Sequence, residues 1–139
     1  MANSLTLKND EEVPKQFIFE TPFTMVLAGP TSCGKTTFIK NMIHTAHERF
    51  EDPPSRFLYF YNRYQPIFAQ LQETNINIDF VHGMPTLSQI EDQLAEDEDL
   101  TLIFDDIANY MSKETVEVFT VLSHHARVIV TKRTKALQL

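Results

Sequence analysis

Short apolar runs are spaced along the chain, and between them lie longer segments in which apolar residues recur every three or four positions. Runs of this length predict buried strands, and the recurrence predicts helices with one apolar face. The strand runs are Phe23–Ala28, Phe57–Tyr61, Ile76–Val81, Leu100–Phe104 and Arg127–Thr131. Phe17–Phe19 predicts a further short strand, ended by Pro22, and the unbroken run after Pro22 is typical of a strand buried on both faces.

Helices are expected between these strands. Their predicted positions are Lys35–His47, Pro66–Glu73, a segment around Leu87, Ile90 and Leu94, and Lys113–Ser123. Within the first helix Phe38 is spaced to share an apolar face with Ile39 and Met42. Strands that alternate with helices pair in parallel through right-handed crossovers. The sequence therefore predicts an α/β fold in three layers, with a central, mainly parallel sheet.

Composition and charge limit the class of protein. A chain of 139 residues is expected to form one domain, with a flexible leader over residues 1–15 and the folded part over residues 16–139. A net charge of −7 and a pI near 5.1 argue against broad capture of nucleic acid by a monomer, but not against contact through a local basic loop in a ring. The one cysteine excludes an internal disulfide and is typical of a reducing compartment. No apolar run approaches the ~18 residues of a membrane span, so we expect an intracellular protein that is neither secreted nor inserted in a membrane.

The octet that follows the Phe23–Ala28 run has the pattern G-x-x-x-x-G-K-[ST] of a phosphate-binding loop. It consists of Gly29, Pro30, Thr31, Ser32, Cys33, Gly34, Lys35 and Thr36. Its place between a strand and a helix is the context that the mechanism requires, because backbone N–H groups and the helix N-terminus together bind phosphate. Gly29 is expected to allow a sharp turn and Gly34 a close approach of backbone to phosphate. The backbone from Thr31 to Thr36 would then cradle the β-phosphate.

Side chains of the same loop are expected to complete a site for ATP and Mg²⁺. Lys35 would reach the β- and γ-phosphates, the Thr36 hydroxyl would hold Mg²⁺, and Thr37 would lie near the α-phosphate. The rival interpretation is a glycine turn with a purely structural role. For Cys33, a small residue that fills a tight loop is the simplest interpretation.

Two consecutive carboxylates end the apolar run Leu100–Phe104. Asp105 is expected to hold Mg²⁺ with Thr36, and Asp106 to position the attacking water. Aspartate is one methylene shorter than the glutamate usual at the second position. The alternative is that both residues merely cap the following segment.

Several further blocks resemble the FtsK–HerA group of P-loop ATPases, specifically the genome-packaging ATPases of Polinton (Maverick) elements, poxviruses and their relatives. Beside the Pro22–Thr37 stretch, the matching blocks are Tyr61–Phe68, Phe80–Pro85, Ile103–Asp106, and Phe119-Thr120 with Ser123-His124-His125. The resemblance covers roughly residues 17–131, and the Tyr-Gln-Pro and Ser-His-His blocks are its most specific parts. It implies a ring-forming motor that uses ATP to move double-stranded DNA into a capsid, with a capsid protein as a further partner, at viral assembly sites in the host cytoplasm or nucleus.

The chain departs from this family in two ways. Relatives follow the last strand with a Gln-Asn pair that senses the γ-phosphate, whereas this chain has a basic segment that includes Lys132, Arg133 and Lys135. Relatives also continue through further strands and helices, so the resemblance implies that C-terminal elements are missing. We expect the basic segment to be a solvated tail, with contact to phosphate backbone as the alternative. Arg63 and Arg127 are candidates for an arginine finger, a residue that reaches the nucleotide site of a neighbouring subunit.

Two other functions fit the loop. A nucleotide kinase shares it but needs an arginine-rich lid, which the sequence lacks. A remnant that binds nucleotide without hydrolysing it would follow from loss of the C-terminal elements.

Overall fold

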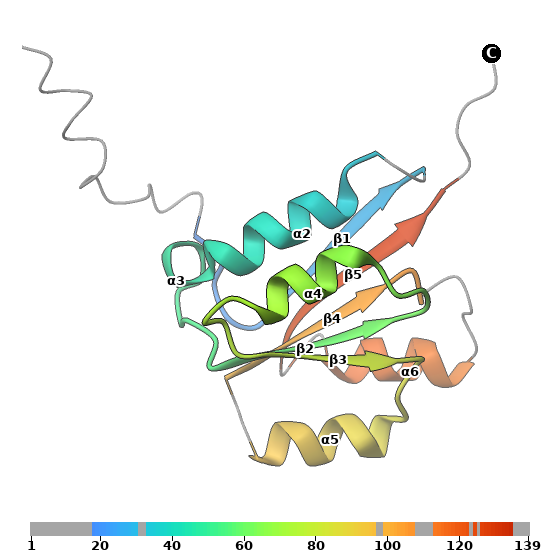
Figure 1. Ribbon diagram of the computed structural model, residues 1–139. Helices are drawn as coiled ribbons and strands as arrows, with labels where there is room; N and C mark the ends of the chain where they lie inside the picture. Colours follow the sequence, from blue (N-terminus) through green and yellow to red (C-terminus); the bar gives the residue numbers. More distant parts are fainter. Residues whose placement is uncertain are drawn as a thin grey trace, which may run out of the picture.

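The computed structural model of the protein describes residues 18–30, 33–96, 99–107, 113–122, 124 and 126–134, apart from the side chains of residues 114–116. Its centre is a five-stranded sheet in the order β1-β5-β4-β2-β3, in which every pairing is parallel (Figure 1). The strands are β1 (Phe23–Gly29), β2 (Arg56–Tyr61), β3 (Ile78–His82), β4 (Leu100–Asp105) and β5 (Arg127–Arg133). The predicted α/β fold and its five strands are thus confirmed, with ends that differ by one or two residues.

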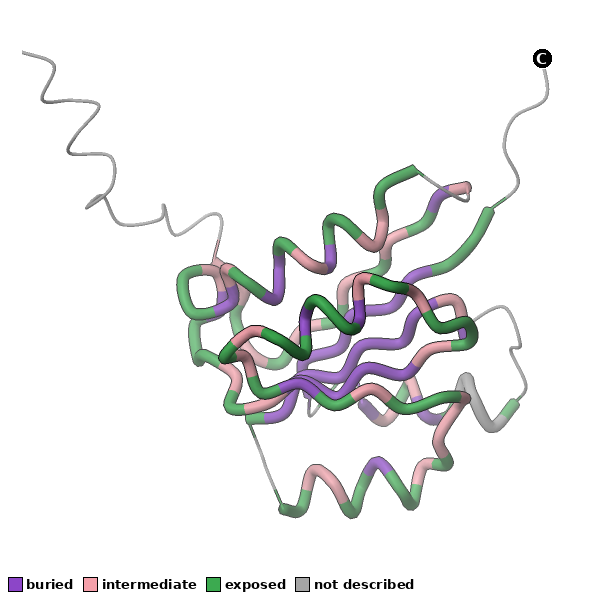
Figure 2. Tube along the Cα trace, in the orientation of Figure 1, coloured by how far each residue is buried: buried purple, intermediate pink, exposed green. Residues whose placement is uncertain are grey.

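Helices cover both faces of the sheet, which gives the predicted three layers. Two of them, α2 (Lys35–His44) and α4 (Pro66–Gln72), lie on one face, and α5 (Leu87–Glu96) and α6 (Lys113–Leu122) lie on the other (Figure 1). Each face has its own apolar core, because the strand side chains alternate between them. Tyr59 and Phe68 belong to the core under α2 and α4, and Phe60 and Ile90 to the core under α5 and α6. The central strands β4 and β5 are buried along most of their length (Figure 2).

The expectation that the first strand is buried on both faces is wrong. β1 is an edge strand that pairs with β5, and its burial alternates along its length. Val26 is 62% exposed, since α5 and α6 cover β2, β4 and β5 rather than β1 on that face. An apolar run is therefore compatible with an edge strand as well as with a central one.

The first predicted helix is also divided. It stops at His44, and a short helix α3 (Ala46–Arg49) follows after Thr45. The Thr45 hydroxyl donates to the carbonyl of Asn41 at 2.8 Å, a local bond that competes with regular helix geometry. Phe38, expected on the apolar face, is 44% exposed.

The predicted strand at Phe17–Phe19 is not formed by its described part. Phe19 makes a single bridge to Phe50, and Phe17 lies outside the described residues. The ring centroid of Phe19 lies 5.4 Å from that of Phe23, and this contact closes the core beside α3. Among the described residues, every helix is too short or too polar to cross a membrane.

Candidate nucleotide site

A cleft of about 380 Å³ lies at the carboxyl edge of the sheet, where the segments after β1, β2 and β4 meet the end of β5. Ligands of open parallel sheets bind at this edge. The lining residues are Cys33, Gly34, Lys35, Thr36, Thr37, Arg63, Gln65, Asp105, Asp106 and Arg133. The structure therefore places the predicted loop residues 33–37 and both predicted aspartates around one cavity. Gly29 ends β1 and Pro30 follows it, but neither lines the cleft, and Thr31 and Ser32 lie outside the described residues.

The two glycines of the loop differ in what the structure requires of them. Gly34 is the N-cap of α2 and has a φ of 98°, the left-handed region that favours glycine, whereas a Cβ there would meet nothing within 4 Å. At Gly29 a Cβ would lie 2.5 Å from the Sγ atom of Cys33. Gly34 thus supplies the turn, and Gly29 supplies the space in which Cys33 packs.

Lys35 is the first residue of α2, so its ammonium lies close to the loop that precedes it. Its Nζ atom donates to the carbonyls of Gly29 and, at 3.3 Å, Pro30. The first turn of α2 contains no acidic residue, and the positive end of the helix dipole is therefore open to an anion in the cleft. Thr36 is half-buried beside Lys35, and Thr37 is exposed.

Asp105 is held by three side chains, two from the neighbouring strands β2 and β5 and one from the residue that precedes α4. It is 4% exposed; its Oδ1 atom accepts from the Thr131 hydroxyl at 2.7 Å, and its Oδ2 atom accepts from the Tyr59 hydroxyl at 2.6 Å and from the Gln65 amide at 3.5 Å. Burial raises the pKa of Tyr59 far above its ordinary value, and the charge of Asp105 raises it further, so the phenol stays a donor. Gln65 belongs to the Tyr-Gln-Pro block, which gives that block a place in the site.

Asp106 adopts an unusual backbone conformation, with a φ of 58°. Its N–H donates to the Thr131 hydroxyl oxygen at 2.9 Å, so Thr131 connects the two consecutive aspartates. The Oδ2 atom of Asp106 accepts from Arg133 Nη2 at 3.2 Å, while its Oδ1 atom is buried and has no hydrogen-bond partner among the described residues. A non-glycine residue held at positive φ is costly, and such residues often occur at functional sites.

Two predictions about basic residues are wrong. Arg133 was expected in a solvated tail, but it is the last residue of β5 and lines the cleft. Arg127 was a candidate arginine finger for a neighbouring subunit. It is only 2% exposed and lies at the opposite end of β5, so it cannot reach another subunit. There its Nε atom donates to the Thr21 hydroxyl at 3.0 Å and its Nη1 atom to the carbonyl of Asp99 at 2.9 Å. Arg63 is exposed and lines the cleft, and Lys135 lies outside the described residues.

The oxygen atoms in the cleft fit Mg²⁺ better than a metal that needs nitrogen or sulfur ligands. The Thr36 hydroxyl and the carboxylates of Asp105 and Asp106 are hard ligands, and the buried Oδ1 atom of Asp106 has no partner within the described part of the chain. The described residues contain no group of three or more His, Cys, Asp or Glu that would hold a metal ion. Proteins commonly bind Mg²⁺ through one or two carboxylates together with phosphate oxygens. His124 is exposed just after α6, and His125 lies outside the described residues.

The parallel sheet and the strand–loop–helix unit at its edge define an α/β sandwich of the P-loop NTPase type. No protein-family model matches the chain, and no curated protein matches it. Among solved structures, one of C. elegans PCH-2 matches with a TM-score of 0.41 and 18% identity, over 84% of this chain. The chain spans 30% of that structure's length.

Proposed function

We propose that this chain binds ATP together with Mg²⁺ in the cleft at the carboxyl edge of the sheet and hydrolyses it. The observation that carries the proposal is the convergence of the G-x-x-x-x-G-K-T loop with Asp105 and Asp106 around one cavity. A cradle of backbone N–H groups, one lysine and two carboxylates is the set of parts that phosphoryl transfer needs. The Gly29–Thr36 octet, with Thr37 after it, would form the nucleotide-binding segment.

Four residues of the cleft have distinct tasks in this proposal. Lys35 exchanges its bonds to loop carbonyls for phosphate oxygens, and its charge then opposes the negative charge that builds up during transfer. The Thr36 hydroxyl and Asp105 would hold Mg²⁺, which would neutralise phosphate charge when bound. Tyr59 and Thr131 fix the Asp105 carboxylate in one orientation. Asp106 accepts a hydrogen bond from the attacking water and so orients it.

Thermal unfolding with and without nucleotide tests the binding step. Ligand at a hundred times its dissociation constant stabilises a protein by about 2.7 kcal/mol, which corresponds to a rise of several degrees in melting temperature. We expect this rise with ATP and MgCl₂ for the wild-type chain and a loss of most of it for Lys35→Ala. Lys40→Ala is the matched control, because Lys40 lies on the same helix but does not line the cleft. An unchanged melting temperature in saturating ATP and MgCl₂ would refute the proposal.

Phosphate release tests the second step. Asp106→Asn should retain the nucleotide-induced rise in melting temperature and release phosphate at least tenfold more slowly. Equal loss of binding and turnover would assign Asp106 to metal coordination or to folding instead.

From the family resemblance alone, we also propose that turnover drives translocation of double-stranded DNA by a homo-oligomeric ring, with a capsid protein as a further partner. Duplex DNA should then raise the rate of phosphate release, and sedimentation with ATP should reveal a ring. A rate that ignores duplex DNA, with sedimentation as a monomer, would leave an ATPase without this motor role.

Nucleotide binding without turnover is a second candidate function, and one contact favours it. Arg133 Nη2 binds the Oδ2 atom of Asp106 at 3.2 Å, which occupies half of the carboxylate expected to orient water. A rise in melting temperature with ATP and no phosphate release, even with duplex DNA, would select this function.

A further inference from the structure

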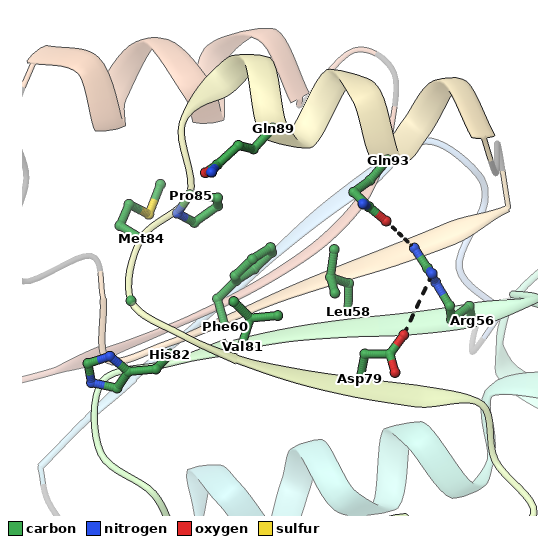
Figure 3. Close-up of a pocket in the computed structure, with 11 residues that line it drawn as sticks. Arg56, Leu58, Phe60, Asp79, Val81, His82, Met84, Pro85, Gln89 and Gln93 are labelled. Atoms are coloured by element: carbon green, nitrogen blue, oxygen red, sulfur yellow. Dashed lines mark hydrogen bonds and ion pairs between the residues drawn. The ribbon is translucent and has the colours of Figure 1, made fainter.

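A second cavity lies on the opposite face of the sheet from α2, between α5 and the strands β2 and β3 (Figure 3). Its volume is about 640 Å³, which is within the usual range for ligand sites and larger than the nucleotide cleft. Leu58 and Phe60 of β2 and Val81 of β3 form its apolar floor, and Arg56, Asp79 and Gln93 form its polar end (Figure 3). We call this cavity the α5 groove. None of its residues lines the nucleotide cleft.

The α5 groove opens along an unpaired edge of the sheet. β3 is the last strand in the sheet order and pairs with β2, so its outer N–H and C=O groups lack a strand partner within the described sheet. Of the β3 side chains on the α5 side, Asp79 and Val81 are exposed, and Val81 is 40% exposed. The cause is the position of α5, which packs through Ile90 on the core formed by β2 and β4. Sheet edges of this kind are sites at which an extended peptide adds a strand.

The polar end of the α5 groove contains a donor without an acceptor. Arg56 donates from Nη2 to the Oε1 atom of Gln93, and its Nη1 atom lies 3.6 Å from Asp79 Oδ2 (Figure 3). Its Nε atom is buried and has no hydrogen-bond partner among the described residues. A guanidinium with an unpaired donor gains from a further acceptor, so a ligand that supplies one is favoured at this end of the groove. Because Asp79 already neutralises the guanidinium, a neutral amide oxygen fits this position better than a second carboxylate.

We propose that the α5 groove binds an extended, uncharged segment of a partner protein, which adds a sixth strand to the free edge of β3. Alternate side chains of that segment point into the groove, because strand side chains alternate between faces. An apolar side chain covers Val81, and an Asn or Gln two positions away, beside Asp79, offers its amide oxygen to Arg56. The partner motif is thus an apolar residue and an amide residue at positions i and i±2 of an extended strand.

Selection from a phage-displayed library of random nine-residue peptides against the whole chain tests this proposal. Enriched peptides, labelled with fluorescein, are then measured by fluorescence anisotropy against variants. We expect at least tenfold weaker binding to Val81→Lys and unchanged binding to Val26→Lys. Val26 is the matched control, since it is an exposed valine, 62% accessible, on the other edge strand. Arg56→Lys should abolish the preference for Asn or Gln over Ser, and N-methylation of alternate peptide bonds should abolish binding.

Four results would overturn the proposal. They are the absence of any enriched peptide, equal binding of the enriched peptides to wild type and Val81→Lys, binding that survives N-methylation, and a dimer in gel filtration that Val81→Lys dissociates. The last result would identify a second copy of this chain as the occupant. Circular dichroism checks that each variant is folded, which we expect because the substituted valines are exposed.

Discussion

Replacement of Tyr59 by phenylalanine removes one oxygen atom and, with it, the shortest hydrogen bond that Asp105 accepts. The bond of 2.6 Å joins a buried phenol to a carboxylate that is 4% exposed. After the substitution, the Oδ2 atom retains the Gln65 amide at 3.5 Å. Hydrogen bonds to charged groups contribute about 1.5–3 kcal/mol, so we expect Tyr59→Phe to lower the free energy of unfolding by about 2 kcal/mol at pH 7, or about thirtyfold in the unfolding equilibrium.

The pH dependence of this difference provides a stricter test. Burial and the charge of Asp105 raise the pKa of Tyr59 in the folded state, whereas the unfolded tyrosine titrates near ~10. Above that pH the unfolded chain binds fewer protons than the folded one, so stability falls as the pH rises. At pH 11 the wild type should have lost about 1.4 kcal/mol through Tyr59, and its advantage over Tyr59→Phe should shrink to less than about 1 kcal/mol.

Urea unfolding followed by circular dichroism at pH 7 and at pH 11 measures both quantities. Tyr61→Phe is the matched control, since Tyr61 lies two residues along β2 and its hydroxyl makes no hydrogen bond with the described residues. A Tyr59→Phe variant as stable as the wild type at pH 7, or a difference that stays constant to pH 11, would refute the assigned role of this phenol.

Three further substitutions test the cleft and the strand that forms its wall. Gly29→Ala should lower stability by about 1 kcal/mol, because the new Cβ would lie 2.5 Å from the Sγ atom of the exposed Cys33, which must rotate away. Gly29→Ala with Cys33→Ala should recover most of this loss, because the two Cβ atoms would be 3.7 Å apart; no recovery in urea unfolding would contradict the clash. Arg133→Gln should weaken ATP·Mg²⁺ binding about tenfold in calorimetry, because Arg133 lines the cleft. Lys132→Gln should leave binding unchanged, because Lys132 is exposed and does not line the cleft. Equal effects of the two substitutions would exclude a specific contact. Arg127→Met should lower the melting temperature, because it removes buried hydrogen bonds. The variant should keep the rise in melting temperature that ATP and MgCl₂ cause, and loss of that rise would disprove a purely structural role.

The fold was predictable because each strand is a separate apolar run and each helix has its own periodicity. The position of each strand within the sheet was not predictable. β1 reads as a buried strand, but it lies at the edge because β5, the last strand in the sequence, pairs between β1 and β4. Local sequence contains no information on which strand will insert beside which, and the exposure of Val26 follows from that order alone.

The candidate site was predictable to the extent that it follows a contiguous motif. The loop and the two aspartates could be named from the sequence, whereas pairing between strands brings Tyr59 and Thr131 to Asp105 and Arg133 to the cleft. The register places Thr131 beside Asp105 and Arg133 beside Gly29. A signal for Arg133 was present in hindsight, since a basic residue just after a strand adjoining the phosphate loop lies at the same carboxyl edge. The Gln65 contact had a weaker signal, namely the Tyr-Gln-Pro block itself.

β5 links the cleft to the far side of the protein through a single stiff segment. Arg133 touches Asp106 at one end, and Arg127 is anchored to Thr21 and Asp99 at the other. Six steps of an extended strand span about 20 Å, so the two arginines lie about 20 Å apart at opposite ends of β5. A shift of β5 along its own axis would strain the hydrogen bonds of Arg127. It would also strain those that Asp105 and Asp106 make with Thr131 and Arg133. Contacts at both ends of β5 therefore fix the position of this strand along its neighbours, and with it the register that brings Thr131 to Asp105 and Arg133 to the end of β1.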